Sequence, residues 1–438
     1  MNVEKIFYII ISTILIAVFI YFTFVFSPSP GGSESSSKIK TIYFVDHISS
    51  AHQKVIDHFN ERYKGSIKVE TVNLSFEKFS TNERKELLAR YLRSKNDRID
   101  IFSVDQIWVP RFARWAVPLQ KFLDSSEISN VTPNAMQTCV FNDTLVAVPL
   151  YIDVAVMFYR DDLLKKIPDY VKILDELKHS ITWERFIAIH LQNSKLKNPF
   201  YIFQADDYEG LLCTFADLLA NQNKPIVNTE GKILVNSPEG RKSLQLLVDL
   251  VNKYDVSPKE VTHLKENESF RYFAQNNALF LRSWSSMYDD SVEYLTKEMR
   301  SALRMAPLPH FQNTKPSAVY GGWNLMISQF SEKIPEVIKF TKFLLSEESQ
   351  KIMYEEGGYL PTNKKLYNDT AFVNKHIEIG FFEELYKIGF HRPFMKDYTN
   401  MSDILSYFIN RAIKKEIPVD KALEEAELRI KEKTILVK

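Results

Sequence analysis

Strand and helix patterns alternate over the first part of this sequence, and this alternation is the feature that most limits its possible folds. Strand-like segments at 40–45, 67–74 and 99–104 are separated by two segments with apolar residues at helical spacing. Such repeats predict a parallel sheet with right-handed crossovers. Because ligands bind beyond the carboxyl ends of parallel strands, we expect His47, Asp105 and Trp108, which follow two of these strands, at the functional edge.

The rest of the chain is predicted to be mainly helical, with a later return of strand-like sequence. Helices are expected from Thr182 onward and across residues 240–254. A strand at 278–281 is followed by an extended segment, residues 305–309, which we expect to cross back to the first part of the fold. Since only 12 of 438 residues are glycine, we expect closure about extended crossings near Asp153, Pro307 and Pro361.

Composition indicates a globular protein with two sizeable cores. The chain has 438 residues, of which 45% are hydrophobic and 25% charged, and its formal net charge is +1. This near-neutral charge argues against a nucleic-acid partner, which usually requires a basic face. The two cysteines, Cys139 and Cys213, do not indicate a disulfide framework, and Cys213 lies in an apolar run typical of a buried position.

The N-terminal segment predicts attachment to a membrane. Residues 6–26 carry no charged side chain and, at about 1.5 Å per residue, can cross a hydrocarbon core of about 30 Å as a helix. We predict a transmembrane anchor at 1–26 and a flexible tether at 27–37, with the globular part on the extracellular or periplasmic side of the cytoplasmic membrane. The alternative is a cleaved signal peptide, whose apolar region would be shorter and followed by small residues, whereas Phe24 and Phe26 are bulky.

Motifs of the common catalytic and metal-binding classes are absent from the sequence. It contains no His-Glu-x-x-His, Gly-x-Ser-x-Gly or Walker segment. His47 and His52 are five residues apart, a spacing that does not align two metal ligands on one helix face. We therefore expect no catalytic residues, metal or cofactor. A glycosidase remains an alternative, because Asp105, Asp153 and Glu209 would supply its paired carboxyl groups if they met in a cleft.

A different set of side chains favours sugar binding. A sugar has apolar C–H faces and a rim of hydroxyl groups, so its site needs aromatic plates with carboxylate, amide or guanidinium groups at the edges. The candidate plates are Trp108, Tyr151, Tyr208, Trp284 and Trp323, and the candidate edge groups are Asp105, Asp153, Gln204, Glu209 and Arg392, with His47 and Gly322 beside them. Any one of these rings is equally well explained as part of the core. The Gly321–Gly322 pair before Trp323 is explained either by a tight turn or by a close approach of the backbone to a ligand.

Six short segments occur together in an order and spacing that resemble one family. They are residues 104–108, 148–153, 204–210, 320–324, 358–362 and 392–393. From about Lys38 onward the chain is similar to the sugar-binding proteins of bacterial and archaeal ABC importers, in the maltose/trehalose-binding subgroup. The resemblance implies an α/β, two-lobed periplasmic-binding-protein-like fold of the maltose-binding type, in which each lobe is a mainly parallel sheet flanked by helices.

The resemblance also implies a division of the chain and roles for particular residues. Residues 38–153 and 305–360 would form lobe 1, and residues 154–304 and 361–438 lobe 2. Asp153 takes the place of the family's acidic ligand, Trp284 that of an aromatic platform, and Arg392 that of an arginine that reaches the cleft. Trp323 follows the glycine pair typical of the trehalose-like subgroup. The chain departs from many relatives at residues 221–224, where they carry two glycines.

The function implied is that of a substrate-binding subunit. Such a protein captures a disaccharide or oligosaccharide outside the membrane by closing its lobes and delivers it to the permease subunits of the importer. A sugar-sensing receptor built on the same fold is the alternative that shares all these sequence features.

Overall fold

The computed structural model describes residues 39–76, 78–193, 197–287 and 294–433. The predicted anchor at 1–26 and the predicted tether at 27–37 lie outside these ranges. Within them, no helix combines the length and the apolar character needed to span a membrane. Residues Lys40–Lys438 form one of two compact units of the chain, and the fold of this unit is described below.

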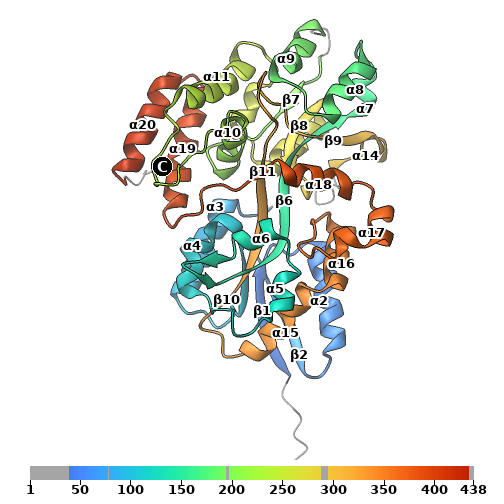
Figure 1. Cartoon of the computed structure of the whole chain (residues 1–438), viewed down its shortest axis with the longest axis vertical. Helices are drawn as coiled ribbons and strands as arrows, with labels where there is room; N and C mark the ends of the chain where they lie inside the picture. Colours follow the sequence, from blue (N-terminus) through green and yellow to red (C-terminus); the bar gives the residue numbers. More distant parts are fainter. Residues whose placement is uncertain (1–38, 77, 194–196, 288–293, 434–438) are drawn as a thin grey trace, which may run out of the picture. The chain divides into compact units, whose positions relative to one another are not determined.

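A nine-stranded sheet runs through the whole unit in the described residues (Figure 1). Its central order is β2-β1-β3-β10-β6-β8-β7, with β9 added to β6 and β11 to β10. The strands are β1 (Lys40–Asp46), β2 (Ile67–Asn73), β3 (Ile101–Asp105), β6 (Val148–Arg160), β7 (Tyr201–Ile202), β8 (Phe280–Trp284), β9 (Leu303–Ala306), β10 (Ala318–Ile327) and β11 (Gly389–Phe390), and β4 (Val140–Phe141) pairs with β5 (Thr144–Leu145) outside this sheet.

Two long strands, β6 and β10, connect the two ends of the sheet. Every residue of both strands is buried, as expected for apolar, β-branched segments covered on both faces. The first part of β6 pairs with β10, and its second part pairs with β8 and β9. We call the end of the unit around β1–β3 the first lobe and the end around β7–β9 the second lobe; they are the lower and upper parts of Figure 1.

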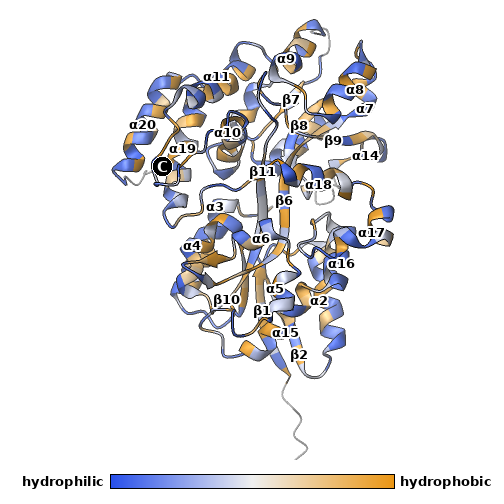
Figure 2. Cartoon of the chain, in the orientation of Figure 1, coloured by the Kyte–Doolittle hydropathy of each residue, from blue (hydrophilic) through white to orange (hydrophobic). Residues whose placement is uncertain are grey.

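Helices cover both lobes, and their apolar faces complete a hydrophobic core that extends through both. In the first lobe α16 packs against α2, and in the second α19 packs against α10, α11 and α20. The strands are mainly hydrophobic, whereas the helices mix both kinds of residue (Figure 2). The helices include α2 (Ser50–Arg62), α3 (Thr81–Arg93), η1 (Gln106–Trp108), α4 (Val109–Phe112), α5 (Ser125–Ser129), α6 (Pro133–Gln137), α7 (Asp161–Leu164), α8 (Tyr170–Lys178), α9 (Trp183–Gln192), α10 (Glu209–Asn221), α11 (Pro238–Asn252), α12 (Glu266–Gln275), α14 (Lys297–Ala302), α15 (Ile334–Leu344), α16 (Glu347–Gly357), α17 (Thr370–Lys375), α18 (Ile379–Lys387), α19 (Tyr398–Ile413) and α20 (Val419–Lys431).

The parallel sheet predicted from the early repeats is confirmed in the first lobe only. There β1 pairs parallel with both β2 and β3. In the second lobe β8 and β9 each pair antiparallel with β6, and only β7 with β8 is parallel. The expectation of a mainly parallel second lobe is therefore wrong, because β6 lies between β8 and β9 in that lobe and both of these strands run in the opposite direction to it.

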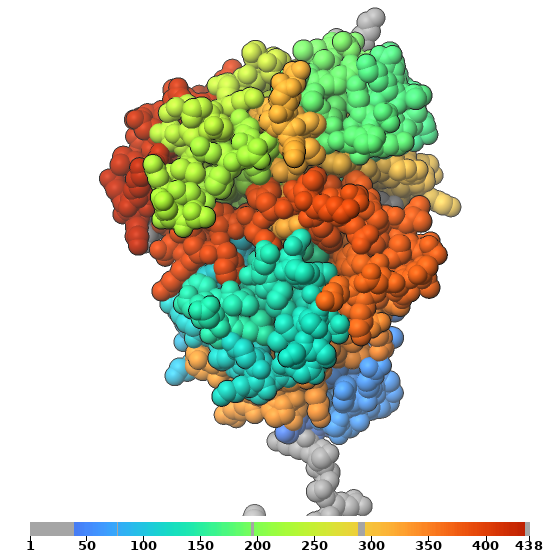
Figure 3. Space-filling model, in the orientation of Figure 1, coloured from blue at the N-terminus to red at the C-terminus, as the bar shows by residue number. Residues whose placement is uncertain are grey.

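The return to the first lobe occurs later than we expected. Residues 303–306 pair with the distal end of β6, and His310 bonds to the backbone of Ile181 and Trp183, so this segment stays in the second lobe. The crossing is β10, which begins at Ala318 and continues into the first lobe beside β3. A further connection follows β11 and leads to α19; orange-red residues of this part of the chain lie between the upper and lower parts in Figure 3.

Candidate ligand-binding site

A cavity of about 590 Å³ lies between the two lobes, at the end of the first-lobe strands where the parallel-sheet rule placed it. A volume of this size is typical of sites for small molecules. Both lobes contribute side chains to its wall. The lining includes His47, Asn73, Phe76, Asp105, Tyr151, Asp153 and Trp323 from the first lobe and the crossing strands, and Glu209, Lys265, Glu266, Trp284, Ser286 and Arg392 from the second lobe and the last connection.

The indole of Trp284 lies on the backbone of β10. A Cβ atom added to Gly321 would be 2.8 Å from Cζ3 of that indole, so the close approach requires glycine. On the same ring, the guanidinium carbon of Arg282 lies 4.7 Å from the centroid. Trp284 is only half-buried and lines the cavity, which makes it a supported aromatic plate with access to the ligand space.

The other candidate plate, Trp323, is packed more deeply and is 8% exposed. The guanidinium of Arg84 lies 4.2 Å from its ring centroid and 4.0 Å from that of Phe76, so the cation is held between two cavity-lining rings. Asp46 accepts a hydrogen bond of 2.9 Å from this guanidinium. Trp108 meets Trp323 edge-on, with centroids 5.7 Å apart. Trp323 therefore both lines the cavity and closes the first-lobe core beneath it.

Asp153 lines the cavity from the part of β6 that pairs with β10, opposite Gly321. It is 6% exposed, and burial raises the pKa of its carboxyl group. The hydroxyls of Ser285 and Ser286 both donate to it, the second at 2.5 Å, and the Val154 amide donates at 3.0 Å. These bonds fix the carboxyl group and orient Ser286, which itself lines the cavity.

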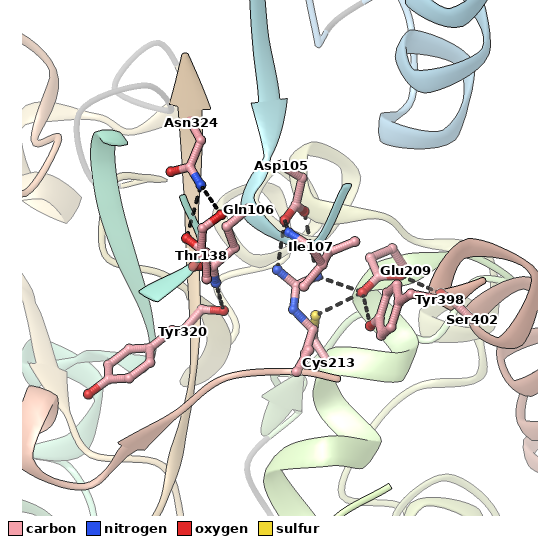
Figure 4. Close-up of polar contacts among 11 residues, drawn as sticks. Asp105, Gln106, Ile107, Thr138, Glu209, Cys213, Tyr320, Asn324, Tyr398 and Ser402 are labelled. Atoms are coloured by element: carbon pink, nitrogen blue, oxygen red, sulfur yellow. Dashed lines mark hydrogen bonds and ion pairs between the residues drawn. The ribbon is translucent and has the colours of Figure 1, made fainter. Parts of the chain in front are cut away.

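A buried arginine joins carboxylates of the two lobes. Arg392 donates to Asp105 Oδ1 at 2.9 Å and to Glu209 Oε1 at 2.6 Å, and its side chain is 1% exposed. Glu209 also accepts hydrogen bonds from the hydroxyls of Tyr398, at 2.6 Å, and Ser402 (Figure 4). Asp105 is the last residue of β3 and the N-cap of η1, and Glu209 begins α10, so the ion pairs connect the strand end of one lobe to a helix start in the other.

Three more predicted residues lie in the cavity wall, on the first-lobe side and on the crossing strand β10. His47 packs beside Phe76, with centroids 4.8 Å apart, and burial lowers the pKa of its imidazole to about 4, so it is neutral at physiological pH. Tyr151 packs against Tyr359 at 4.5 Å between centroids. Gly322, at φ +124°, occupies a backbone conformation that favours glycine, and a Cβ there would be 2.6 Å from the Tyr151 carbonyl.

Three predicted residues lie outside the cavity wall: Trp108, Gln204 and Tyr208. Trp108 and Tyr208 are each 2% exposed, and Gln204 is fully buried. Gln204 exchanges hydrogen bonds with the carbonyl and guanidinium of Arg282, and so supports the strand that carries Trp284. Tyr208 is the N-cap residue of α10. Trp108, Gln204 and Tyr208 therefore pack behind the residues that line the cavity and do not face the cavity themselves.

Two residues that line the cavity, Phe76 and Ser286, and two that support it, Arg84 and Ser285, were not identified from the sequence. Ser285 and Ser286 directly follow Trp284, so their position beside a candidate plate was the signal that would have found them. Phe76 and Arg84 carried no such signal, because their pairing depends on the loop that joins β2 to α3. In the described residues no group of three or more His, Cys, Asp or Glu side chains is arranged to hold a metal ion.

The fold and the cleft define a class of two-lobed binding proteins, and comparison with known proteins identifies the family. Residues 45–351 match the model of the bacterial extracellular solute-binding proteins; this is more than half of the chain, which therefore belongs to that family. A probable ABC transporter-binding protein of Deinococcus radiodurans is 27% identical over 363 residues, covering 80% of this chain and 84% of its own. The arabinooligosaccharide-binding protein of Bacillus subtilis is 22% identical over 251 residues, covering 55% of this chain and 54% of its own.

Solved structures of the same class superpose over most of the chain. The maltose-bound MalE3 of T. maritima has a TM-score of 0.81 and 26% identity, covering 89% of this chain and 99% of its own. The GacH receptor of Streptomyces glaucescens, solved alone and with acarbose, has a TM-score of 0.77 at 18% identity, covering 91% and 100%. The second likeness shows the fold alone.

Proposed function

We propose that this protein is the substrate-binding subunit of an ABC importer, which captures a sugar or oligosaccharide by closure of its lobes and delivers it to the permease. The observation that carries the proposal is the cavity between the lobes, where Trp284 supplies an aromatic plate and Asp153 with Ser286 supplies polar groups. This combination suits a ligand with apolar C–H faces and a rim of hydroxyls. Membership of the solute-binding family supports the same role.

The relatives favour a carbohydrate over other solutes. The T. maritima structure holds maltose, and the B. subtilis relative is described as binding arabinooligosaccharides. We propose His47, Tyr151, Asp153, Trp284, Gly322 and Trp323 as the ligand-contacting set. Asp105, Glu209 and Arg392 belong to the ion-pair network beside them, and Trp108, Gln204 and Tyr208 support the wall.

The domain division and the membrane attachment are part of the proposal. We assign residues 39–153 to the first lobe, in keeping with the predicted range of 38–153, and propose that the second lobe extends through 317 rather than 304, because 303–310 pair within it. The connection after β11 then returns the chain to the second lobe, later than the predicted boundary at 361, because the backbone of Thr362 and Asn363 pairs with Thr132 and Val131 of the first lobe. The uncharged segment at 6–26 would hold this unit outside the cytoplasmic membrane.

A binding role is favoured over glycoside cleavage by the state of the carboxyl groups. Asp105 and Glu209 share the Arg392 guanidinium, and Asp153 accepts hydrogen bonds from two serine hydroxyls. These three acids are thus each held in a fixed acceptor role. A glycosidase needs one carboxyl group poised to donate a proton across a glycosidic bond.

The test is a thermal-shift screen of the full chain against neutral disaccharides and oligosaccharides. A ligand that binds only the folded state raises stability by RT ln(1 + [L]/Kd), so at least one sugar should raise the melting temperature in a concentration-dependent manner. Chromatography of the same mixtures should show the sugar unchanged. A panel without any shift would contradict sugar binding, and shorter products accumulating with time would contradict a pure binding role.

A further inference from the structure

The position of Arg392 points to a role in closing the lobes. Its guanidinium is 1% exposed and bonded to carboxylates of both lobes. Glu209 is anchored within the second lobe by Tyr398 and Ser402 of α19. Asp105 is anchored within the first lobe, where its carboxylate accepts a hydrogen bond of 3.2 Å from the Ile107 amide. Of the two ion pairs of Arg392, the one to Asp105 is therefore the one that reaches the first lobe.

We propose that Arg392 is a positioning residue that neutralises two opposed carboxylates and thereby permits the lobes to close, and that it acts on the ligand only through this closure. The inference rests on the proposed function. Without the guanidinium, Asp105 and Glu209 would face each other in a buried site as like charges, which is costly in a low-dielectric environment. The hydrogen bonds to these two acids engage Nη1 and Nη2 of Arg392, so both terminal nitrogens are already bonded.

Among the groups around the trio of Asp105, Glu209 and Arg392, it is Arg392 that neutralises the two carboxylates. Burial raises the pKa of the thiol of Cys213 and of the phenol of Tyr398, so neither is ionised at neutral pH. Lys85 of α3 and the Asp217–Arg282 pair act on these residues by their charge, without a hydrogen bond to Asp105, Glu209 or Arg392. The titratable and charged groups that face the trio are Lys85 on α3, Cys213 and Asp217 on α10, Arg282 on β8 and Tyr398 on α19.

Because the proposal depends on repulsion between two carboxylates, it predicts how sugar affinity changes when one charge, and then a second, is removed. The substitution Arg392→Gln should weaken binding of the best sugar from the screen by roughly tenfold or more, since it leaves buried charges unpaired. Adding Asp105→Asn removes one of the two charges, so the double variant should regain most of the affinity. Lowering the pH should also restore Arg392→Gln, because burial already raises the pKa of Asp105 and a protonated carboxyl ends the repulsion. A direct ligand contact would be restored by neither change.

A ligand-independent measurement separates this proposal from the question of the ligand. Spin labels on the full chain at Lys121→Cys in the first lobe and Lys172→Cys in the second report the distance between the lobes; both positions are exposed, and the native Cys139 and Cys213 are buried. Without sugar, Arg392→Gln should shift this distance distribution to longer values, and Arg392→Gln/Asp105→Asn should return it toward that of the wild type.

A matched control is Arg111→Gln. Arg111 also spans the lobes, by a bond of 2.9 Å to Thr399, but its side chain is 25% exposed, so its loss should change the distances and the affinity little.

An unchanged distribution for Arg392→Gln, or an affinity that Asp105→Asn does not restore, would overturn the proposal. If Arg392→Gln does not fold, Arg392→Lys keeps the cation and should match the wild type; separated lobes in that variant would overturn it. Failure of every sugar to bind would contradict the proposed function alone.

Discussion

At the scale of single residues, Trp323 illustrates how one side chain serves both the core and the cleft. It packs against Arg84, Phe76 and Trp108 while lining the cavity. We expect Trp323→Ala to lower the free energy of unfolding by about 3–5 kcal/mol, because a large aromatic side chain leaves a cavity in the first-lobe core. Denaturant titration checks this. A loss below 1 kcal/mol would show that the core does not depend on the indole.

The same residues show how far the candidate site could be predicted from the sequence. Nine of the twelve predicted positions line the cavity, because they follow strand ends or lie in segments that resemble the family's binding motifs. Exposure within the site could not be predicted: Trp323 was a candidate plate that follows a glycine pair, but Arg84 covers one of its faces from a helix far away in the sequence. The ion pairs of Arg392 with Asp105 and Glu209 likewise join residues that only the tertiary fold brings together.

At the scale of elements, the adjacent glycines of β10 have separable roles. A Cβ at Gly321 would meet the ring of Trp284 at 2.8 Å, whereas a Cβ at Gly322 would meet the backbone of β6 at 2.6 Å, at a residue whose φ is +124°. Gly321→Ala should therefore displace the indole and weaken sugar binding with little loss of stability. Gly322→Ala should cost on the order of 1–3 kcal/mol of stability through backbone strain.

Melting temperature and affinity, measured on both alanine variants, distinguish these effects. Each variant is the control for the other, since the substitutions are chemically identical and one residue apart. If Gly321→Ala were the more strongly destabilised of the two, the assignment of Trp284 as a plate resting on β10 would be wrong.

Element prediction succeeded where the pattern was local and failed where pairing was long-range. The first three strands and their helices were confirmed, and Thr182 caps α9 as expected, by accepting from the Arg185 amide. An extended segment such as 305–309 has the same local sequence pattern in a crossing and in an edge strand, so the pairing of residues 303–306 with β6 in the second lobe had no local signal. The antiparallel arrangement of that lobe was missed for the same reason.

At the scale of the whole molecule, buried histidines predict a loss of stability in acid. Burial lowers the pKa of His47 and His391 to about 4 and that of His52 to about 3, whereas in the unfolded chain histidine titrates near 6.5. The unfolded state therefore binds more protons between these values. Stability should be greatest above about pH 6.5 and fall as the pH drops toward 4, by on the order of 1.4 kcal/mol per unit of pKa shift in each histidine.

Denaturant titrations at pH 7 and pH 5 measure this loss. His52→Gln should reduce the difference between the two pH values, while the same substitution at the exposed His58 should leave it unchanged. Equal stability of the wild type at both pH values would show that these histidines do not remain neutral in the folded state.

The central claim is that a sugar binds in the cleft between the lobes against Trp284. Calorimetric titration of the full chain and of Trp284→Ala with the best sugar from the screen tests it most directly. We expect one sugar per chain in the wild type and an affinity about thirtyfold weaker in the variant, equivalent to about 2 kcal/mol, with a melting temperature close to that of the wild type. Unchanged affinity in Trp284→Ala would place the sugar elsewhere and contradict the account.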